Sequence, residues 1–258
     1  MHEIKQESPS QDFVKCWQAA GLHIQNQSQD SIKIWIKADL NPPLLEHLSF
    51  RLGNQLFFIR LFDVDGNLEI SGNLKGLQRI ADGCKGFACG MPMRKKYDQW
   101  MPTESGWGLV NLKTDKVINP LDFVSDELIE MTDWELHDFA VQVVRNKLEQ
   151  DGKKITGWNS DPEIQPSIWF KNGDELEWVV VKFSRYPNDK PNIPSNMATI
   201  ATSVMKMSNA GKGFFASLSI VNGEDPFDPS AKESNNFLPL YRGYALMTST
   251  VELIPYKK

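Results

Sequence analysis

One lysine in the second half of the chain stands in an aliphatic run, at a place where a cation could take part in chemistry. Residues 164–186 form two predicted strands joined by a turn at Gly173, and the second strand carries Lys182 directly after three valines. Side chains alternate between the two faces of a strand. Lys182 is therefore expected to share a face with Val180, whereas Glu177 points to the opposite face. What such an amine can do depends on the carboxylates beside it.

Three acidic residues are close enough in the sequence to be candidate partners of this lysine. Asp161 and Glu163 precede the first strand of the hairpin, and Glu135 stands in the first turn of a predicted helix. Carboxylate oxygens are the ligands that Mg²⁺ prefers. Each acid also has a structural interpretation, because acids in a turn are ordinarily solvated and Thr132 with Glu135 has the spacing of a capping box.

The order of elements around Lys182 adds a more specific expectation. Residues 130–222 are predicted to run helix, strand, strand, strand, helix, strand, which resembles the core order of the PD-(D/E)XK (restriction-endonuclease-like) superfamily. The resemblance implies that Lys182 is a catalytic lysine and that Glu135 matches the glutamate of the first helix. If the protein is a nuclease, Asp161 and Glu163 could hold the metal ion in place of the lost acids. In that superfamily the carboxylates bind magnesium, which activates a water molecule and clamps the scissile phosphate.

Two positions depart from the pattern of the superfamily, so the resemblance is to a degenerate active site. Ser167 follows Pro166 where the family has an aspartate, and Val180 stands two residues before Lys182 where the family has an acid. A divalent cation would lose two of its charged ligands there. We therefore expect no cofactor, and magnesium only if other acids take the place of the missing ones.

Aromatic residues and one arginine are the candidate contacts for a ligand or a partner. Trp158, Trp169 and Trp178 fall around one small predicted sheet, and Arg242 lies in the segment Tyr-Arg-Gly-Tyr. Exposed aromatic side chains mark binding surfaces, and arginine recognises carboxylates or phosphates. The structural alternatives are core packing for the tryptophans and an internal ion pair for Arg242.

The cysteines and one histidine are given structural interpretations. Cys16, Cys84 and Cys89 are an odd number with no clustered histidine to complete a zinc site, so we expect reduced, partly buried thiols. His137 lies one helical turn after Asp133, a spacing that suits a metal ligand. A surface histidine paired with an acid explains the same spacing, and we adopt that interpretation.

Hydrophobic periodicity predicts elements along the whole chain. The expected elements are a helix at 12–22, a strand at 31–40, a helix at 42–54 with Gly53 as its C-cap, a strand at 55–67, a helix at 74–84, a strand at 86–93, a helix at 131–152 and a strand at 213–222. Strands and helices alternate across 30–93, which indicates an α/β unit. We expect an α+β or mixed α/β protein in two closely packed halves. They are an N-terminal α/β domain at 1–124 and a restriction-endonuclease-like domain at 125–258, a helix-flanked mixed sheet.

Composition restricts the class of partner. The net charge of −5 and the pI of about 5.5 give no basic field that would draw the chain to nucleic acid or to an anionic membrane. No apolar run approaches the roughly 18 residues of a membrane span. We expect a cytoplasmic protein whose partner is another protein; nucleic acid has no support from the net charge.

Three functions are consistent with these residues. The favoured one is a non-catalytic protein-binding factor, of the accessory or immunity type, on a nuclease-like scaffold. The alternatives are a divergent metal-dependent nuclease and a small-ligand binder that uses an aromatic cleft.

Overall fold

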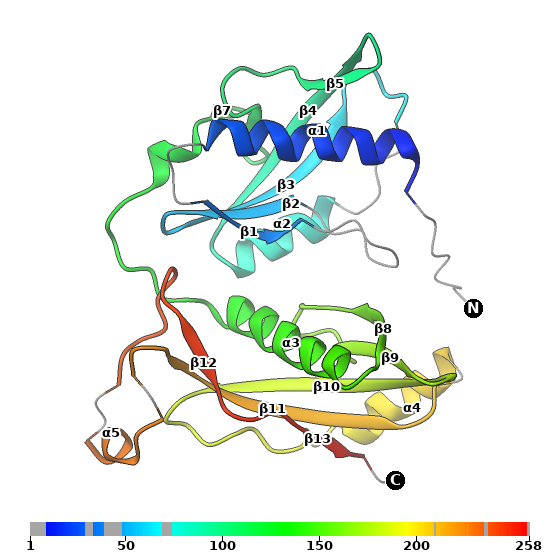
Figure 1. Cartoon of the computed structure of the whole chain (residues 1–258), viewed down its shortest axis with the longest axis vertical. Coiled ribbons are helices and arrows are strands. Elements are labelled where there is room, and N and C mark those ends of the chain that lie inside the picture. Colours follow the sequence, from blue (N-terminus) through cyan, green and yellow to red (C-terminus); the bar gives the residue numbers. More distant parts are fainter. Residues whose placement is uncertain are drawn as a thin grey trace. The chain divides into compact units, whose positions relative to one another are not determined.

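The chain divides into two compact units. A computed structural model describes residues 9–28, 33–38, 48–68, 74–208, 210–225, 227–234 and 237–256 (Figure 1). One unit is Ile4–Leu128, and the described residues of the other come from Ile129–Lys258. The sequence placed this boundary after residue 124. Ser125 and Glu127 belong with the first unit because the Asn54 side chain donates to the Ser125 hydroxyl at 3.0 Å and to the Glu127 carbonyl at 2.9 Å.

The first unit is built on one seven-stranded mixed sheet. Its strands are β1 (Lys33–Lys37), β2 (Leu48–Leu52), β3 (Gln55–Asp63), β4 (Phe87–Lys96), β5 (Gln99–Pro102), β6 (Leu109–Asn111) and β7 (Val117–Ile118). They follow the order β1-β2-β3-β4-β6-β7, and β5 pairs with β4. β3 and β4 are parallel, and α2 (Leu74–Gly83) lies between them in the sequence. A short 3-10 helix, η1 (Pro120–Phe123), follows β7.

A long helix supplies much of the core of this unit. α1 (Gln11–Gln27) begins after Ser10, whose hydroxyl accepts a hydrogen bond from the Phe13 N–H at 3.1 Å. Cys16, Ala20 and Ile24 recur every four residues, so they form one buried stripe on the helix. This stripe packs with alternate residues of β2, β3 and β4 in a single hydrophobic cluster. The predicted helix at 12–22 is therefore confirmed, and it is longer than expected.

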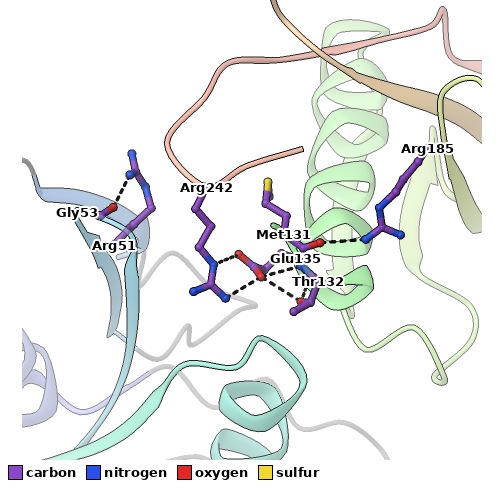
Figure 2. Close-up of polar contacts among 7 residues, drawn as sticks. All are labelled: Arg51, Gly53, Met131, Thr132, Glu135, Arg185 and Arg242. Atoms are coloured by element: carbon purple, nitrogen blue, oxygen red, sulfur yellow. Dashed lines mark hydrogen bonds and ion pairs between the residues drawn. The ribbon is translucent and has the colours of Figure 1, made fainter. Parts of the chain in front are cut away.

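The predicted helix at 42–54 is wrong where the structure describes it. Leu48–Leu52 is strand β2, with Leu48, Phe50 and Leu52 buried. The residues before Leu48 lie outside the described part of the chain. Gly53 is not a helix C-cap: it has φ of 55° and opens a two-residue turn that pairs Leu52 with Gln55, and its carbonyl accepts from Arg51 Nη1 at 2.6 Å (Figure 2). From Leu48 onward, an antiparallel hairpin of β2 and β3 thus stands where the second part of a helix followed by a strand was expected.

The second unit is a six-stranded mixed sheet with helices on it. Its elements are α3 (Asp133–Gln150), β8 (Lys154–Trp158), β9 (Ile168–Asn172), β10 (Glu175–Arg185), α4 (Met197–Met207), β11 (Gly213–Asn222), α5 (Pro229–Ser234), β12 (Leu246–Thr248) and β13 (Glu252–Pro255). The sheet order is β12-β11-β10-β9-β8, and β13 also pairs with β11. β10 and β11 are parallel, while β8, β9 and β10 are antiparallel neighbours.

The two longer helices of this unit cover opposite faces of the sheet. Val179 and Val181 of β10 pack in one hydrophobic cluster with the buried residues of α3, whereas Trp178 and Val180 pack in another with those of α4. Figure 1 shows the two helices on either side of β10 and β11. The predicted α+β class, with a helix-flanked mixed sheet in the second half, is confirmed.

The described thiols and helices bear on two further expectations. Cys16, Cys84 and Cys89 are buried and form no disulfide with one another, in agreement with the predicted reduced thiols. Burial raises the pKa of the Cys16 and Cys89 thiols to about 12, so neither is a reactive thiolate at neutral pH. Among the residues that the structure describes, no helix combines the length and the apolar character that crossing a bilayer requires.

Candidate functional site

The predicted alternation along β10 is confirmed. The register of β10 with β9 and with β11 contains no bulge, so Lys182 and Val180 share the face that α4 covers, and Glu177 points to the other face. Lys182 is half-buried, and burial lowers the pKa of its amine below the usual value. Within the described residues, Lys182 has no ion pair and no hydrogen bond. It is a cation that has lost part of its hydration without gaining a carboxylate.

Ser167, the residue that the sequence resemblance matched to an aspartate, has a structural role. It is fully buried, and its hydroxyl accepts from the Val181 N–H at 3.1 Å and donates to Gln165 Oε1 at 3.1 Å. Its own N–H donates to the Val179 carbonyl at 3.0 Å. Ser167 therefore continues the pairing of β9 with β10 past Ile168, through one main-chain bond to Val179 and one side-chain bond to Val181.

Glu135 is fully committed at the start of α3. The predicted capping box is present: Thr132 Oγ1 accepts from the Glu135 N–H at 3.3 Å, and Glu135 Oε2 accepts from the Thr132 N–H at 2.9 Å. Arg242 donates from Nε to Oε1 at 2.8 Å and from Nη2 to Oε2 at 3.0 Å (Figure 2). The Arg242 and Glu135 side chains are 1% and 9% exposed. Arg242 thus takes the structural role weighed for it, an internal ion pair, instead of a ligand contact on the surface.

The two other candidate acids lie in the loop between β8 and β9. Asp161 is 8% exposed, and its Oδ1 accepts from the Glu163 N–H at 2.9 Å, while its own N–H donates to Asn159 Oδ1 at 2.8 Å. These bonds shape the loop. Glu163 is exposed. Of the two acids, only Asp161 is buried, and its carboxylate accepts a hydrogen bond from the main chain of its own loop.

His137 is a buried member of the site, and its prediction as a surface residue is wrong. It is 1% exposed, its ring lies 6.3 Å from that of Phe183, and its Nε2 is buried without a hydrogen-bond partner in the described structure. Burial and the nearby charge of Lys182 lower its pKa to about 4, and the charges of Asp138 and Asp161 partly oppose this effect. The imidazole is therefore neutral at pH 7.

The acid that was expected to pair with His137 has another partner. Arg185 Nη1 binds the Asp133 carboxylate. Figure 2 shows the second contact of this arginine, in which Nη2 donates to the Met131 carbonyl at 2.9 Å. The signal that could have placed His137 inside is its spacing, since Val141 and Val144 follow it at four and seven residues on the buried face of α3.

The three tryptophans do not form one aromatic surface. Trp178 is 2% exposed and Trp169, its partner across β9 and β10, packs in the same cluster under α4. Trp158 packs in the cluster under α3, where the Arg145 guanidinium lies 4.3 Å from its ring centroid. Core packing, the structural alternative, accounts for Trp178, and a cation–π contact accounts for Trp158.

The polar candidates of the second unit, Lys182, His137 and Asp161, come from β10, α3 and the β8–β9 loop. Lys182 lies on the face of the sheet that α4 covers, whereas His137 lies on the buried face of α3, and within the described residues no hydrogen bond or ion pair joins the three. Sequence reasoning named Lys182 and Asp161, and the fold adds His137. Within the described part of the chain, no group of three or more His, Cys, Asp or Glu side chains is placed to hold a metal ion. Taken singly, these side chains are a partly desolvated amine, a neutral imidazole and a buried carboxyl group.

Comparison with known proteins gives one match, and it falls in the second unit. Residues 134–255 match a family described as a domain of unknown function (DUF8840). The matched segment runs from the first turn of α3 to the end of β13 and includes Lys182, His137 and Asp161. No curated protein and no solved structure matches the chain.

Proposed function

We propose that this chain is a non-catalytic protein-binding factor, of the accessory or immunity type, in which a nuclease-like scaffold is kept without a nuclease site. The proposed setting is the cytoplasm, and the proposed factor needs no cofactor. The observation that carries the proposal is the Glu135 carboxylate, which binds Arg242 and Thr132, while Lys182 forms no ion pair with a carboxylate among the residues that the structure describes.

Metal-assisted phosphodiester hydrolysis needs carboxylates that hold the cation next to the lysine. In this chain, the three residues matched to the acidic positions of the superfamily make structural contacts instead. Ser167 bonds to the β10 main chain, Val180 packs under α4, and Glu135 neutralises a buried arginine. Moving Glu135 to a metal would leave Arg242 buried without its partner, which costs about 3–5 kcal/mol in comparable cases.

Charge supports a protein partner over nucleic acid. The net charge of −5 repels a polyphosphate, and most binding to nucleic acid depends on the opposite sign. A protein partner requires no overall excess of positive charge, because charge complementarity between two proteins can be local.

A metal-binding and cleavage assay tests the non-catalytic part of the proposal. Purified full-length protein is titrated with Mg²⁺ and Mn²⁺ to millimolar concentration in a calorimeter, and then incubated with single- and double-stranded DNA and RNA. We expect no saturable heat and no cleavage above that of the Lys182→Ala variant. Cleavage by the wild type that Lys182→Ala abolishes would establish the nuclease alternative instead.

A reconstitution assay tests the protein-binding part. Proteins retained by the tagged chain from extracts of its source cells are identified, expressed separately and mixed with it in pure form. We expect at least one of them to form a complex in sedimentation-velocity runs at micromolar concentration. If none of the purified candidates shifts the sedimentation coefficient, the chain is not a protein-binding factor of this kind.

A further inference from the structure

The turn between β4 and β5 holds a fully exposed aromatic residue in an unusual backbone conformation. Lys96 pairs with Gln99, so Tyr97 and Asp98 are the two central residues of the turn. Their φ values are 48° and 64°, and the Tyr97 side chain is 100% exposed. Turns of this geometry favour asparagine and glycine, because other residues pay roughly 1–2 kcal/mol for a positive φ.

The turn is braced from its own strand and from α1. The Asp98 carboxylate lies 3.0 Å from the Lys95 amine and 3.5 Å from that of Lys15 in α1, and the Lys95 amine also lies 2.9 Å from the carboxylate of Asp12 in α1. Lys95 and Lys15 lower the pKa of Asp98, so its charge is present at neutral pH. These ion pairs hold the backbone of the turn in place, so less backbone entropy is lost when a partner binds it.

The outer face of the same hairpin combines cations with apolar surface. Met93 and Trp100 point inward and are buried, whereas the cross-strand pairs Arg94–Met101 and Lys96–Gln99 point outward. Met101 is 41% exposed, and Lys96 has no ion pair among the described residues. Tyr97 therefore stands at the end of a face that carries the Lys96 cation, an Arg94 paired with Asp65, and one exposed methionine.

We propose that the β4–β5 hairpin is the protein-recognition element of the first unit, with Tyr97 as its anchor and an apolar pocket rimmed by carboxylates on the partner as its target. This inference rests on the proposed protein-binding function and adds the place and chemistry of binding. A strained residue that the surrounding structure holds in place is a sign of function. Tyrosine is among the side chains that dominate interface energies, and Lys96, which has no ion pair within the described residues, complements acidic groups around a pocket.

The charges near the turn favour a protein over nucleic acid as the partner. Asp12, Asp98 and Asp65 pair with Lys95, Lys15 and Arg94, so the hairpin is not a uniformly basic surface. A backbone-binding groove for single-stranded nucleic acid combines stacking with an excess of positive charge. Here one aromatic residue and few uncompensated cations suit a local acidic pocket better.

Peptide display on the full-length protein tests the proposal. A library of random dodecapeptides is panned against the wild type, and the selected peptides are then titrated against three variants. Tyr97→Asn removes the ring and keeps a residue that suits a positive φ, so the turn is preserved. Lys96→Glu reverses the outer charge. Tyr244→Ala removes a tyrosine that is 39% exposed in the other unit and serves as the matched control.

We expect selected peptides that join acidic and apolar residues, bind Tyr244→Ala as they bind the wild type, and lose at least roughly tenfold in affinity with Tyr97→Asn and with Lys96→Glu. The proposal is overturned if no peptide is enriched, if binding is insensitive to Tyr97→Asn, or if a fluorescent single-stranded oligonucleotide binds in a Tyr97-dependent manner. A complex that forms in the reconstitution assay and is unaffected by Tyr97→Asn would leave the protein-binding function standing while refuting this location.

Discussion

At the scale of single residues, the Glu135–Arg242 ion pair of the second unit stabilises the fold. The Glu135 carboxylate accepts two hydrogen bonds from Thr132 and two from Arg242, a residue 107 positions away in the sequence. Residues 129–131 pair with 240–242 through main-chain bonds beside this ion pair. The contact therefore fixes the segment before β12 to the beginning of α3, and its loss should be felt in the stability of the whole unit.

Replacing Arg242 should be costly. Arg242→Met leaves the Glu135 charge buried without its cation, and we expect the free energy of unfolding to fall by about 3 kcal/mol. Arg185→Met is the matched control, because Arg185 also binds a first-turn acid of α3 but is 33% exposed with an acid that is 74% exposed. An exposed pair should contribute at most about 1 kcal/mol. Urea unfolding of both variants measures the difference, and equal losses would contradict the structural role given to Glu135.

His137 should make the protein sensitive to mild acid. Its pKa is lowered from 6.5 to about 4 in the folded state, so the unfolded chain takes up a proton first as pH falls. Stability is then unaffected by this group above pH 6.5 and is lost between pH 6.5 and 4, by at most about 3 kcal/mol. His137→Leu should unfold with a flatter pH dependence than the wild type over that range. Urea unfolding at pH 7, 5.5 and 4.5 measures it; parallel curves would show that His137 is not buried as a neutral group.

Contacts between residues close in the sequence could be predicted for this unit, whereas contacts between distant residues could not. The alternation of β10 and the capping box at Thr132 are local, so both could be predicted and both are confirmed. The partner of Arg242 could not be predicted, because a contact across 107 residues depends on how the chain returns to α3. His137 was misplaced because a titratable residue was weighed by its neighbour Asp133 and not by the buried face on which it lies.

At the scale of elements, the edges of both sheets are poor templates for an added strand. β8 carries a bulge between Ile155 and Gly157, and β1 carries one between Trp35 and Lys37. β7 has two residues, and the edge opposite β8 is divided between β12 and β13. Bulged, short or interrupted edges discourage pairing with another chain. Recognition of a partner through side chains, as proposed for the β4–β5 hairpin, agrees with this property.

The one helix that was predicted wrongly shows how a short pattern can be misread. Leu48, Phe50 and Leu52 alternate as a strand requires, yet they follow prolines and leucines that suit a helix start. The glycine after them fits a helix C-cap as well as a hairpin turn, and pairing with β3 decides in favour of the turn. Longer elements such as α3 contain enough periods to exclude the alternative, so they were predicted correctly.

The close approach of β10 and β11 should make Gly213 sensitive to substitution. Gly213 pairs with Trp178 in the parallel register, and a Cβ at this position would lie 2.2 Å from the indole ring. Because the ring is buried and cannot move freely, we expect Gly213→Ala to lower the free energy of unfolding by about 2 kcal/mol. Gly211→Ala is the control, since its nearest neighbour would be the Leu176 carbonyl oxygen at 3.7 Å. Similar melting temperatures for the two variants would contradict the described register.

At the scale of the whole molecule, each hydrophobic cluster draws its members from one unit. The cluster under α1 uses residues of Ile4–Leu128, and the two clusters on the faces of the second sheet use residues of Ile129–Lys258. A domain with its own core can fold alone. The match to the DUF8840 family is confined to the second of these units, as expected if it is an independent module.

A fragment of residues 129–258 should therefore unfold cooperatively without the first unit, and its stability should depend on where it begins. A fragment that begins at 134, where the family match begins, lacks the Thr132 cap of α3 and the main-chain pairing of Ile129 and Met131 with Arg242 and Leu240. The cap alone contributes about 1 kcal/mol. We expect the longer fragment to be more stable by roughly 2 kcal/mol in urea unfolding followed by circular dichroism, since the lost main-chain bonds add to the lost cap. Equal stability would mean that residues 129–133 do not belong to the module, and a non-cooperative longer fragment would mean that the second core is insufficient by itself.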